Sequence, residues 1–403
     1  MTNKSVSNIE KEKCCGCSAC QQACTANAIQ MVVDEQGFLY PLVDAKRCNN
    51  CGVCFQVCNF TKQLDHNRKV LNAYAFRHKS RKIRLKSSSG GAFVALSDYI
   101  LGQGGIVCGA VVESGTMYLH HICSKSYEQR NRMCGSKYIQ SNLENVYSEI
   151  KKYLVQDVKV LFTGTPCQVS GLLGYLGPAS TSNNLYTMDI FCHGVPSFNV
   201  FKKHLAYLEK KLGRRISCYQ FRDKKYGWNL QTQTAILDNG DIKSNGFVQK
   251  FKQAFLGNMV LRPACYKCKY ASLHRYGDFS VGDFWGVEQI LNVFDNNGVS
   301  IVLCNTEKGK RFFNKASITH YVDEVNLSSI KQSALERCVE KPKESEKFWL
   351  NITHQGYEQT MDKFYPGNIR VKLSRRIHII LRTLGIDRTV LWFMAKIKKH
   401  RQR

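Results

Sequence analysis

Two cysteine runs near the N-terminus constrain this chain more than any other feature of its sequence. Both have the form Cys-x-x-Cys-x-x-Cys-x-x-x-Cys, with cysteines at positions 14, 17, 20 and 24 and at positions 48, 51, 54 and 58. This is the ligand spacing of a bacterial two-cluster domain, in which the fourth cysteine of each run binds the other [4Fe-4S] cluster. We therefore predict one cluster on Cys14, Cys17, Cys20 and Cys58, and a second on Cys48, Cys51, Cys54 and Cys24.

Zinc and disulfides are the alternatives for these cysteines. Structural zinc uses Cys-x-x-Cys pairs, but four-ligand zinc does not explain triplets followed by a fourth cysteine. Disulfides are disfavoured because the chain is long, has no signal-peptide pattern and holds these cysteines close together. The proline usual after each fourth cysteine is replaced by Thr25 and Asn59. Proline is not a ligand, so we expect clusters to bind. Cys15 breaks the spacing and is interpreted as a spare thiol.

The positive charge of the chain is unevenly distributed. The formal net charge is +27, yet residues 1–60 contain five Lys or Arg and five Asp or Glu. A [4Fe-4S] core with four thiolates carries a net charge of about −2, so two clusters would make this segment acidic. We expect this segment, or an external ferredoxin or other acidic electron carrier, to dock on the basic remainder. Nucleic acid is not a predicted partner, because no nucleic-acid motif accompanies the charge.

The length of 403 residues predicts two or three domains. Two β-rich runs around Gly37, at 29–33 and 38–42, predict a hairpin between the cysteine runs. Residues 63–84 are polar and basic, and they lead into a strand near Ala73–Arg77. The predicted divisions are a two-cluster ferredoxin-like domain at 1–62, a linker at 63–84, the two parts of a body at 85–165 and 166–345, and a basic helical tail at 346–403.

Strand, loop and helix alternate in the body. Residues 92–101 have helical periodicity, and buried strands are expected at 105–112, 158–162 and 185–191. A further helix should end near Leu212, and a hairpin over 234–243 has Asn-Gly at its turn. This order predicts an α/β layer with the chemistry at the strand ends. The fold class of the whole chain is therefore α+β, with a ferredoxin-like domain, an α/β body and a helical tail.

Four further cysteines lie in unusual local sequences. Cys167 follows a Gly-Thr-Pro segment, Cys192 precedes His-Gly, and Cys265 and Cys268 form a Cys-x-x-Cys pair. By spacing alone, only the pair suggests a metal site. A single cysteine is more often a small buried apolar side chain.

These motifs resemble a known family. The segments 163–168, 191–194, 265–268 and 278–286 occur in this order in the beta subunit of coenzyme F420-reducing hydrogenase, in related formate dehydrogenase beta subunits and in plant 7-hydroxymethyl chlorophyll a reductase. Residues 73–345 thus resemble the coenzyme F420 hydrogenase/dehydrogenase beta subunit family. The resemblance implies a flavoprotein with FAD beside a [4Fe-4S] cluster. It makes Cys167, Cys192, Cys265 and Cys268 the ligands of a third cluster, against the alternative of buried thiols and a zinc pair.

A serine- and glycine-rich loop is the expected phosphate site of the flavin. It comprises Ser87, Ser88, Ser89, Gly90 and Gly91 and precedes the helix predicted at 92–101. Hydroxyls and free N–H groups at a helix N-terminus suit a pyrophosphate. By itself the loop indicates only a helix cap with flexible glycines, and the resemblance favours FAD. No Gly-x-Gly-x-x-Gly run follows a strand, so a nicotinamide dinucleotide is disfavoured as the direct donor.

The resemblance implies a second flavin loop that contains Ser136, Lys137 and Tyr138. Lys137 is expected to stabilise the N1–C2=O end of reduced flavin, and Tyr138 to cover the ring; the alternative is a surface lysine and a packed tyrosine. Asp283, in an aromatic and Gly-rich stretch, is assigned to the same site. His193 is a candidate proton donor to substrate, or it orients its loop by hydrogen bonding.

The C-terminal tail is basic and amphipathic. Residues 368–403 contain eleven Lys or Arg and one acidic residue, and apolar residues recur with helical spacing from Ile377 to Ile397. Such a helix is typical of the membrane surface, of packing on the body or of a partner interface. The chain has no apolar run of the roughly 18 residues that a membrane-spanning helix needs.

Together these features predict an iron–sulfur flavoprotein oxidoreductase. Single electrons would enter through the ferredoxin-type clusters and reach FAD by way of the third cluster, for two-electron reduction or oxidation of an unidentified small-molecule substrate. The alternative is an electron-transfer subunit of a larger complex that has no organic substrate of its own. The expected location is the cytoplasm, with peripheral contact at the inner face of the membrane through the tail.

Overall fold

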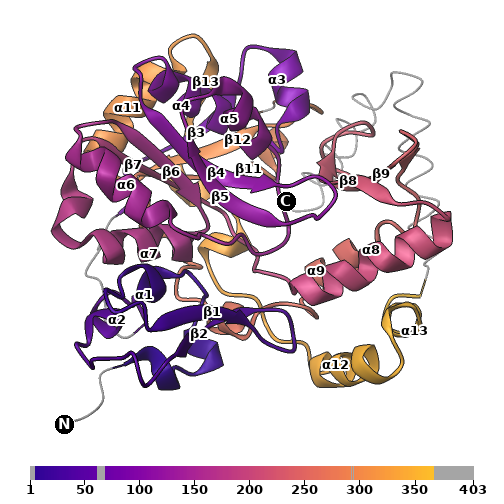
Figure 1. The fold of residues 1–403 in the computed structure, drawn as a ribbon. Coiled ribbons are helices and arrows are strands. Elements are labelled where there is room, and N and C mark those ends of the chain that lie inside the picture. Colours follow the sequence, from indigo (N-terminus) through magenta and orange to yellow (C-terminus); the bar gives the residue numbers. More distant parts are fainter. Residues whose placement is uncertain (1–4, 61–68, 292, 294, 367–403) are drawn as a thin grey trace.

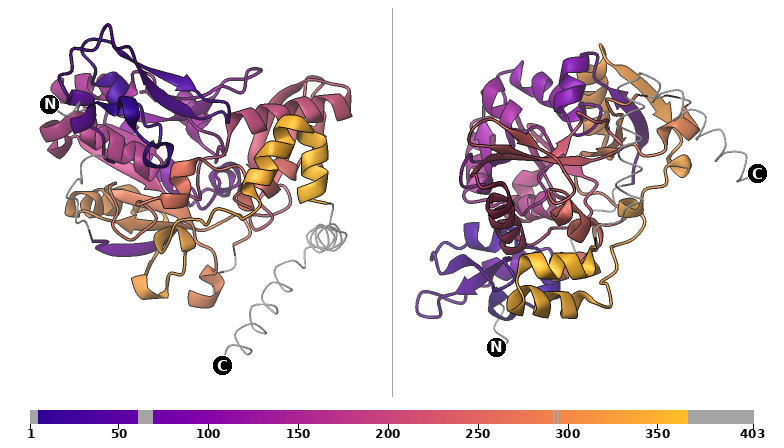
Figure 2. Two further views of the ribbon diagram at one scale, coloured as in Figure 1. Left: turned by 90° about the horizontal axis from the view of Figure 1, so that it is seen from below. Right: turned by 90° about the vertical axis from the view of Figure 1, so that its right-hand side faces the viewer.

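The computed structural model describes residues 5–60, 69–291, 293 and 295–366. A head formed by residues 5–60 lies against a body that is built around an eight-stranded sheet (Figure 1). A second lobe, with a three-stranded sheet and several helices, lies beside the large sheet (Figure 2). The amphipathic tail predicted for 368–403 lies outside the described residues. In the part of the chain that the structure describes, no helix is long and apolar enough to cross a membrane.

The head contains a β-hairpin and short helical turns. Its elements are η1 (Val6–Asn8), η2 (Lys11–Lys13), α1 (Ala19–Gln22), β1 (Ile29–Val33), β2 (Leu39–Val43) and α2 (Val53–Gln56). The hairpin is the predicted one, with Ile29 paired to Val43. Asp34 closes its turn, because its carbonyl accepts from the Gly37 N–H and its Oδ1 from the Phe38 N–H, both at 2.9 Å. Gly37 has φ +87°, which glycine adopts without strain.

The head docks on α7 (Pro166–Leu176) through two glycines of that helix. A Cβ atom at Gly171 would lie 2.9 Å from Sγ of Cys17, and one at Gly174 would lie 2.5 Å from the Val57 carbonyl oxygen. The two glycines are three residues apart and share one helix face. They therefore let the cysteine-bearing segments of the head approach the backbone of the body closely.

The large sheet has the order β13-β3-β12-β11-β7-β6-β4-β5. The four central strands β11, β7, β6 and β4 are parallel, and the strands at both sides are antiparallel to their neighbours. The bounds are β3 (Asn72–Arg77), β4 (Ile106–Val112), β5 (Leu119–Ser124), β6 (Val160–Gly164), β7 (Leu185–Ile190), β11 (Phe279–Asp283), β12 (Ser300–Cys304) and β13 (Tyr321–Val325). This is the mixed α/β sheet expected of the body.

Helices cover both faces of this sheet (Figure 1). On one face, α4, α5 and α11 bury their apolar side chains against the strands. On the other face, α6 and α7 do the same. Their bounds, with those of the short helices around the sheet, are α3 (Arg81–Lys86), α4 (Ala92–Leu101), α5 (Tyr127–Met133), α6 (Val146–Val155), η3 (Gly177–Thr181), α10 (Val287–Ile290), α11 (Glu307–Ser317), η5 (Leu327–Ser329) and η6 (Ser333–Leu335). Because both faces are covered, most residues of the central strands are buried.

The second lobe has its own apolar core, which is rich in aromatic side chains. Its antiparallel sheet has the order β10-β9-β8. The elements are α8 (Phe198–Leu212), β8 (Ile216–Asp223), β9 (Thr232–Leu237), β10 (Ile242–Lys243), α9 (Lys250–Leu256), η4 (Pro263–Lys267), α12 (Ser345–His354) and α13 (Tyr357–Phe364). The predicted hairpin with Asn239 and Gly240 at its turn is β9–β10.

Three features of the fold were not part of the sequence interpretation. Strand β3, within the segment assigned to a linker, lies inside the large sheet between β13 and β12. The proposed division at residue 165 runs through the same sheet, since β6 precedes it and its neighbour β7 follows it. Cys108 and Cys123 lie directly opposite each other in β4 and β5 and form a disulfide, a pairing that the sequence did not indicate.

Candidate functional site

The structure brings the cysteines of the first predicted ligand set together. Burial raises the pKa of Cys20 well above its usual value, and the nearby thiols of Cys17, Cys14 and Cys58 raise it further. Cys58 therefore lies beside the first run although it belongs to the second, as the crossed ligand assignment requires. The position of α1 against α2 explains this proximity (Figure 1).

The second predicted set lies nearer the solvent. Cys51 is exposed, while Cys24, Cys48 and Cys54 are half-buried. The Ala28 N–H donates to Sγ of Cys24 at 3.3 Å, a contact of the kind that stabilises a thiolate ligand. The assignment of these four cysteines to one cluster stays a prediction.

The third set assembles at the carboxyl edge of the parallel strands. Since β6 and β7 are parallel neighbours, the segments after them meet at one edge of the sheet. Cys167 lies there in the first turn of α7, and Cys192 lies in the loop after β7. Cys265 and Cys268 come from η4 and the residue after it. The Val195 N–H donates to Sγ of Cys265 at 3.3 Å, and this bond ties η4 to the loop after β7.

All four thiols of the third set line one cavity of about 320 Å³. Burial, with smaller contributions from neighbouring thiols, raises the pKa of Cys265 to about 12 and that of Cys268 to about 11. Burial and then Cys265, Cys167 and Cys268 raise that of Cys192. A coordinated metal reverses this cost, because bound thiols are deprotonated. The donor set thus fits a cubane cluster. Within the described ranges, no three His, Cys, Asp or Glu side chains could hold a single metal ion.

Cys15 lies between the first and third sets. Its thiol is hydrogen-bonded to both Cys17 and Cys167, and these bonds raise its own pKa. The same bonds lower the pKa of Cys17, and they lower that of Cys167 to about 7. The side chain of Cys15 thus contacts a cysteine of each set, and its interpretation as a spare thiol stays a prediction.

A larger cavity of about 440 Å³ borders the smaller one. Cys167, Cys192 and His193 line both cavities. The larger cavity collects nearly every residue that the sequence assigned to a flavin, namely Ser87, Ser88, Ser89, Gly91, Ser136, Lys137, Tyr138 and Asp283. A group bound there would lie against the wall that carries two ligands of the third set.

Gly90 is the exception, because it packs against the large sheet. Its N–H donates to Oγ of Ser300 at 2.8 Å, and a Cβ atom would lie 2.2 Å from the Phe76 carbonyl oxygen. On the cavity side, Oγ of Ser88 accepts from both the N–H and the hydroxyl of Ser136, at 2.6 and 2.7 Å. This contact joins the two loops that were predicted to bind the flavin.

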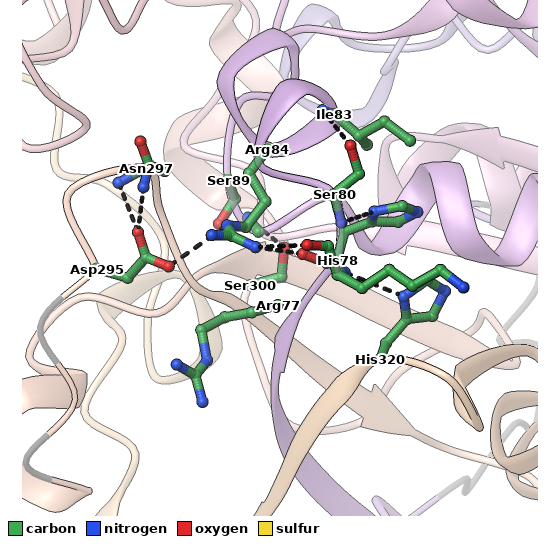
Figure 3. A network of polar contacts seen from close by, with 12 residues as sticks. Arg77, His78, Ser80, Ile83, Arg84, Ser89, Asp295, Asn297, Ser300 and His320 are labelled. Atoms are coloured by element: carbon green, nitrogen blue, oxygen red, sulfur yellow. Dashed lines mark hydrogen bonds and ion pairs between the residues drawn. The ribbon is translucent and has the colours of Figure 1, made fainter.

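A network of polar contacts holds the serine loop, residues 87–91, in place (Figure 3). The Ser89 hydroxyl donates to the Val299 carbonyl at 2.7 Å. The guanidinium of Arg84 lies 3.4 Å from the Asp295 carboxylate. The ammonium of Lys224, which follows β8, donates to the carbonyl oxygens of Arg84 and Ser89 at 2.8 and 2.6 Å. These contacts fix the loop on the side away from the cavity.

Lys137 stabilises the end of α5. Its ammonium donates to the carbonyl oxygens of Arg132, Met133, Cys134 and Gly135 at 2.8–3.2 Å. These oxygens carry the negative end of the helix dipole. Burial lowers the pKa of Lys137 to about 8. The predicted contact of Lys137 with reduced flavin stays a prediction, because here the ammonium holds the loop that carries Ser136 and Tyr138.

Asp283 is held by two residues that the sequence interpretation missed. Arg222 donates to both carboxylate oxygens, at 2.9 and 3.2 Å, and the Trp228 indole N–H donates to Oδ1 at 2.6 Å. Arg222 also donates to the Tyr138 hydroxyl at 3.3 Å. Trp228 stacks on Trp285 with ring centroids 4.5 Å apart. Arg222 thus connects the second lobe to both flavin-assigned loops, and no local motif around it signals this role.

His193 lines both cavities. Its ring packs edge-on against the ring of Phe255, with the ring centroids 4.9 Å apart. Among the described residues, its Nε2 atom is buried without a hydrogen-bond partner. Burial lowers the pKa of His193, which favours the neutral imidazole. Its role as a proton donor stays a prediction.

The comparisons with known proteins cover both groups of cysteines. Residues 13–61 match the 4Fe-4S dicluster domain, and residues 157–330 match the C terminus of the coenzyme F420 hydrogenase/dehydrogenase beta subunit. The first match contains the eight cysteines of the head, and the second contains the four of the body. The cysteine runs and the first match thus define an iron–sulfur protein. More particularly, residues 157–330, which are less than half of the chain, are similar to the C terminus of the coenzyme F420 hydrogenase/dehydrogenase beta subunit, and residues 13–61 to a dicluster domain.

Individual proteins are similar to all or part of this chain. The coenzyme F420-dependent sulfite reductase of Methanocaldococcus jannaschii is 23% identical over 386 residues, which is 90% of this chain and 56% of that protein. The chain therefore spans little more than half of that relative. The ferredoxin-type protein NapF of Haemophilus influenzae is 45% identical over 42 residues, 10% of this chain and 24% of that protein. A chain of the F420-reducing [NiFe] hydrogenase complex of Methanosarcina barkeri aligns over 75% of this chain and 92% of its own, with 17% identity and a TM-score of 0.46.

Proposed function

We propose that this protein is an iron–sulfur flavoprotein that passes single electrons from the two clusters of the head, by way of a third cluster, to FAD in the larger cavity. FAD would then reduce or oxidise a small-molecule substrate by two electrons. The observation that carries this proposal is the shared wall of the two cavities, to which Cys167, Cys192 and His193 all belong. A flavin in the larger cavity would lie within electron-transfer reach of the third cluster.

The bound groups would supply the redox chemistry, since clusters carry one electron at a time and a flavin accepts two. The protein's residues would bind and orient these groups. The loop of Ser87–Gly91 offers hydroxyls and the N-terminus of α4 to the pyrophosphate. Arg222, whose charge is neutralised by Asp283, would hold the part of the cavity where the flavin ring binds. Trp285 lies beside the Arg222 guanidinium. His193 would hold a proton at Nε2 next to the third cluster.

The surface near the second cluster supports an acidic electron carrier as the partner. Cys51 is exposed there, and Lys46 and Arg47 in the preceding segment are exposed as well. Cationic side chains around an exposed cluster favour docking of an acidic ferredoxin and raise its association rate. The family match of residues 157–330 and the sulfite reductase relative make a reduced or oxidised deazaflavin coenzyme the second candidate for carrier or substrate.

An electron-transfer subunit without an organic substrate is the alternative function. The match of residues 157–330 to a family described as a beta subunit favours it, because a subunit works together with other chains. Steady-state turnover with reduced ferredoxin and a candidate substrate would separate the two functions. We expect substrate-dependent oxidation of the ferredoxin by the isolated chain, whereas the alternative gives none until a catalytic partner protein is added.

Iron and flavin analysis after anaerobic reconstitution tests the proposed cofactor content. We expect about twelve irons per chain, as three [4Fe-4S] clusters require, together with one FAD. A brown protein with broad absorption near roughly 400 nm should result. About eight irons would contradict the third cluster and leave the head as the cluster-binding part. Protein that binds no FAD would contradict the flavin part of the proposal.

A further inference from the structure

Arg262 is a fully buried arginine at the junction of head and body. Only 1% of its surface is exposed. It precedes η4, which carries Cys265, yet its guanidinium reaches into the head. Its Nε donates to the Cys14 carbonyl at 2.7 Å, and Nη2 lies 3.8 Å from Sγ of Cys14. The guanidinium carbon also lies over the ring of Tyr40, 4.3 Å from the ring centroid. Arg262 therefore touches a first-set cysteine from the segment that supplies the third set.

The charge of Arg262 has no carboxylate partner among the described residues. The chain's other deeply buried arginines each have one: Arg275 pairs with Asp189, Arg222 with Asp283 and Arg130 with Asp98. A buried ion without a countercharge is strongly unfavourable. The polar groups around Arg262 are carbonyl oxygens, the Gln140 amide at 2.9 Å and the Cys14 sulfur. Of these groups only the Cys14 thiol can become anionic, and a cluster bound to it would supply the missing negative charge.

Arg262 lies beside both sets. Its carbonyl oxygen accepts from the Cys265 N–H at 2.9 Å, so the arginine that contacts Cys14 is also hydrogen-bonded to a cysteine of the third set. The two sets also approach each other at α7. Cys167 lies in the first turn of that helix, and a Cβ atom at Gly171, one turn further on, would lie 2.9 Å from Sγ of Cys17. In the second set, Cys51 is exposed.

We propose that Arg262 is the shared countercation of the first and third clusters and sets the reduction potentials of both. This inference rests on the proposed function, because it needs the third cluster. Transfer of one electron across the junction oxidises the first cluster by one electron and reduces the third by one, and no proton or bond is exchanged. Each reduced cluster carries one more negative charge than its oxidised form. A fixed cation beside both clusters therefore favours reduction of each.

Redox titration of the reconstituted full-length protein, followed by electron paramagnetic resonance, tests this role. Wild-type protein should show three cluster potentials. For Arg262→Gln we expect two of them to fall, with the ratio of reduced to oxidised first cluster changed at least tenfold at a given potential, or about 59 mV for one electron. The third potential, which belongs to the outer cluster, should stay unchanged. Iron content per chain is measured on the same samples.

Two variants serve as controls. Arg262→Lys keeps the charge at the junction, so its potentials should stay nearer to wild type even where packing is disturbed. Lys11→Gln removes a charge from the same head, but Lys11 is 56% exposed and paired with Asp34, so solvent screens it and no shift is expected. Unchanged potentials in Arg262→Gln, or equal shifts of all three, would overturn the proposal. Wild-type protein with about eight irons and two potentials would instead contradict the third cluster itself.

Discussion

Replacing Cys192 by alanine is expected to remove about four irons from each chain and to leave about eight. Cys192 is one of the four cysteines that line the smaller cavity. Without its thiolate, one corner of the cubane cluster would be left open to that cavity. The head should keep both of its clusters, because none of its eight cysteines is altered. Electron transfer from reduced ferredoxin to FAD should fall at least a hundredfold, since the third cluster is the only proposed link between head and flavin.

Cys218→Ala is the matched control for this variant. Cys218 lies in β8 and is exposed, so its loss removes a thiol without touching any ligand set. Iron content, FAD content and the rate of flavin reduction should equal those of the wild type. A Cys192→Ala protein that keeps about twelve irons would contradict the assignment of this cysteine to a cluster.

Replacing Arg222 by methionine is the second change with a large expected effect. Methionine fills much of the same volume, but it leaves the Asp283 carboxylate without its ionic partner. Removing one member of a buried pair costs about 3–5 kcal/mol, and we expect the lower end because the Asp283 side chain is 18% exposed. The variant should also lose FAD, because Arg222 holds Tyr138 and the serine loop in place. Urea unfolding followed by tryptophan fluorescence, together with FAD content, measures both effects.

Two further variants show whether the unpaired carboxylate causes this loss. Arg214→Gln breaks the exposed pair with Asp238, and it should cost less than about 1 kcal/mol. The double variant Arg222→Met with Asp283→Asn removes the charge as well as its partner, so it should recover part of the stability. Equal urea midpoints for Arg222→Met and Arg214→Gln would contradict a structural role for the buried pair.

The sequence predicted the elements that depend on local signals. The helix at 92–101 has the predicted bounds, because its apolar residues repeat with helical period behind a glycine cap. The hairpins at Gly37 and Asn239 follow from turn residues between β-rich runs. The eight cysteines of the head were recognised in the same way, since all the information lies within two short runs.

The body's site depended on long-range topology instead. Cys167, Cys192 and Cys265 are far apart in sequence, and only the parallel order of β6 and β7 and the position of η4 bring them together. The buried positions of Arg222 and Arg262 were not predicted for the same reason. Both are basic residues in a chain with 58 Lys or Arg, and nothing in their local sequence distinguishes a buried arginine from an exposed one.

A reductive titration of the reconstituted protein tests the central claim most directly. Three clusters take up one electron each and FAD takes up two, so anaerobic titration with dithionite should end at about five electrons per chain. The flavin absorbance should bleach together with the clusters, because all four groups form one connected chain. An end point at about two electrons with no flavin bleaching would mean that only the head is redox-active, and it would contradict the proposed route into the body.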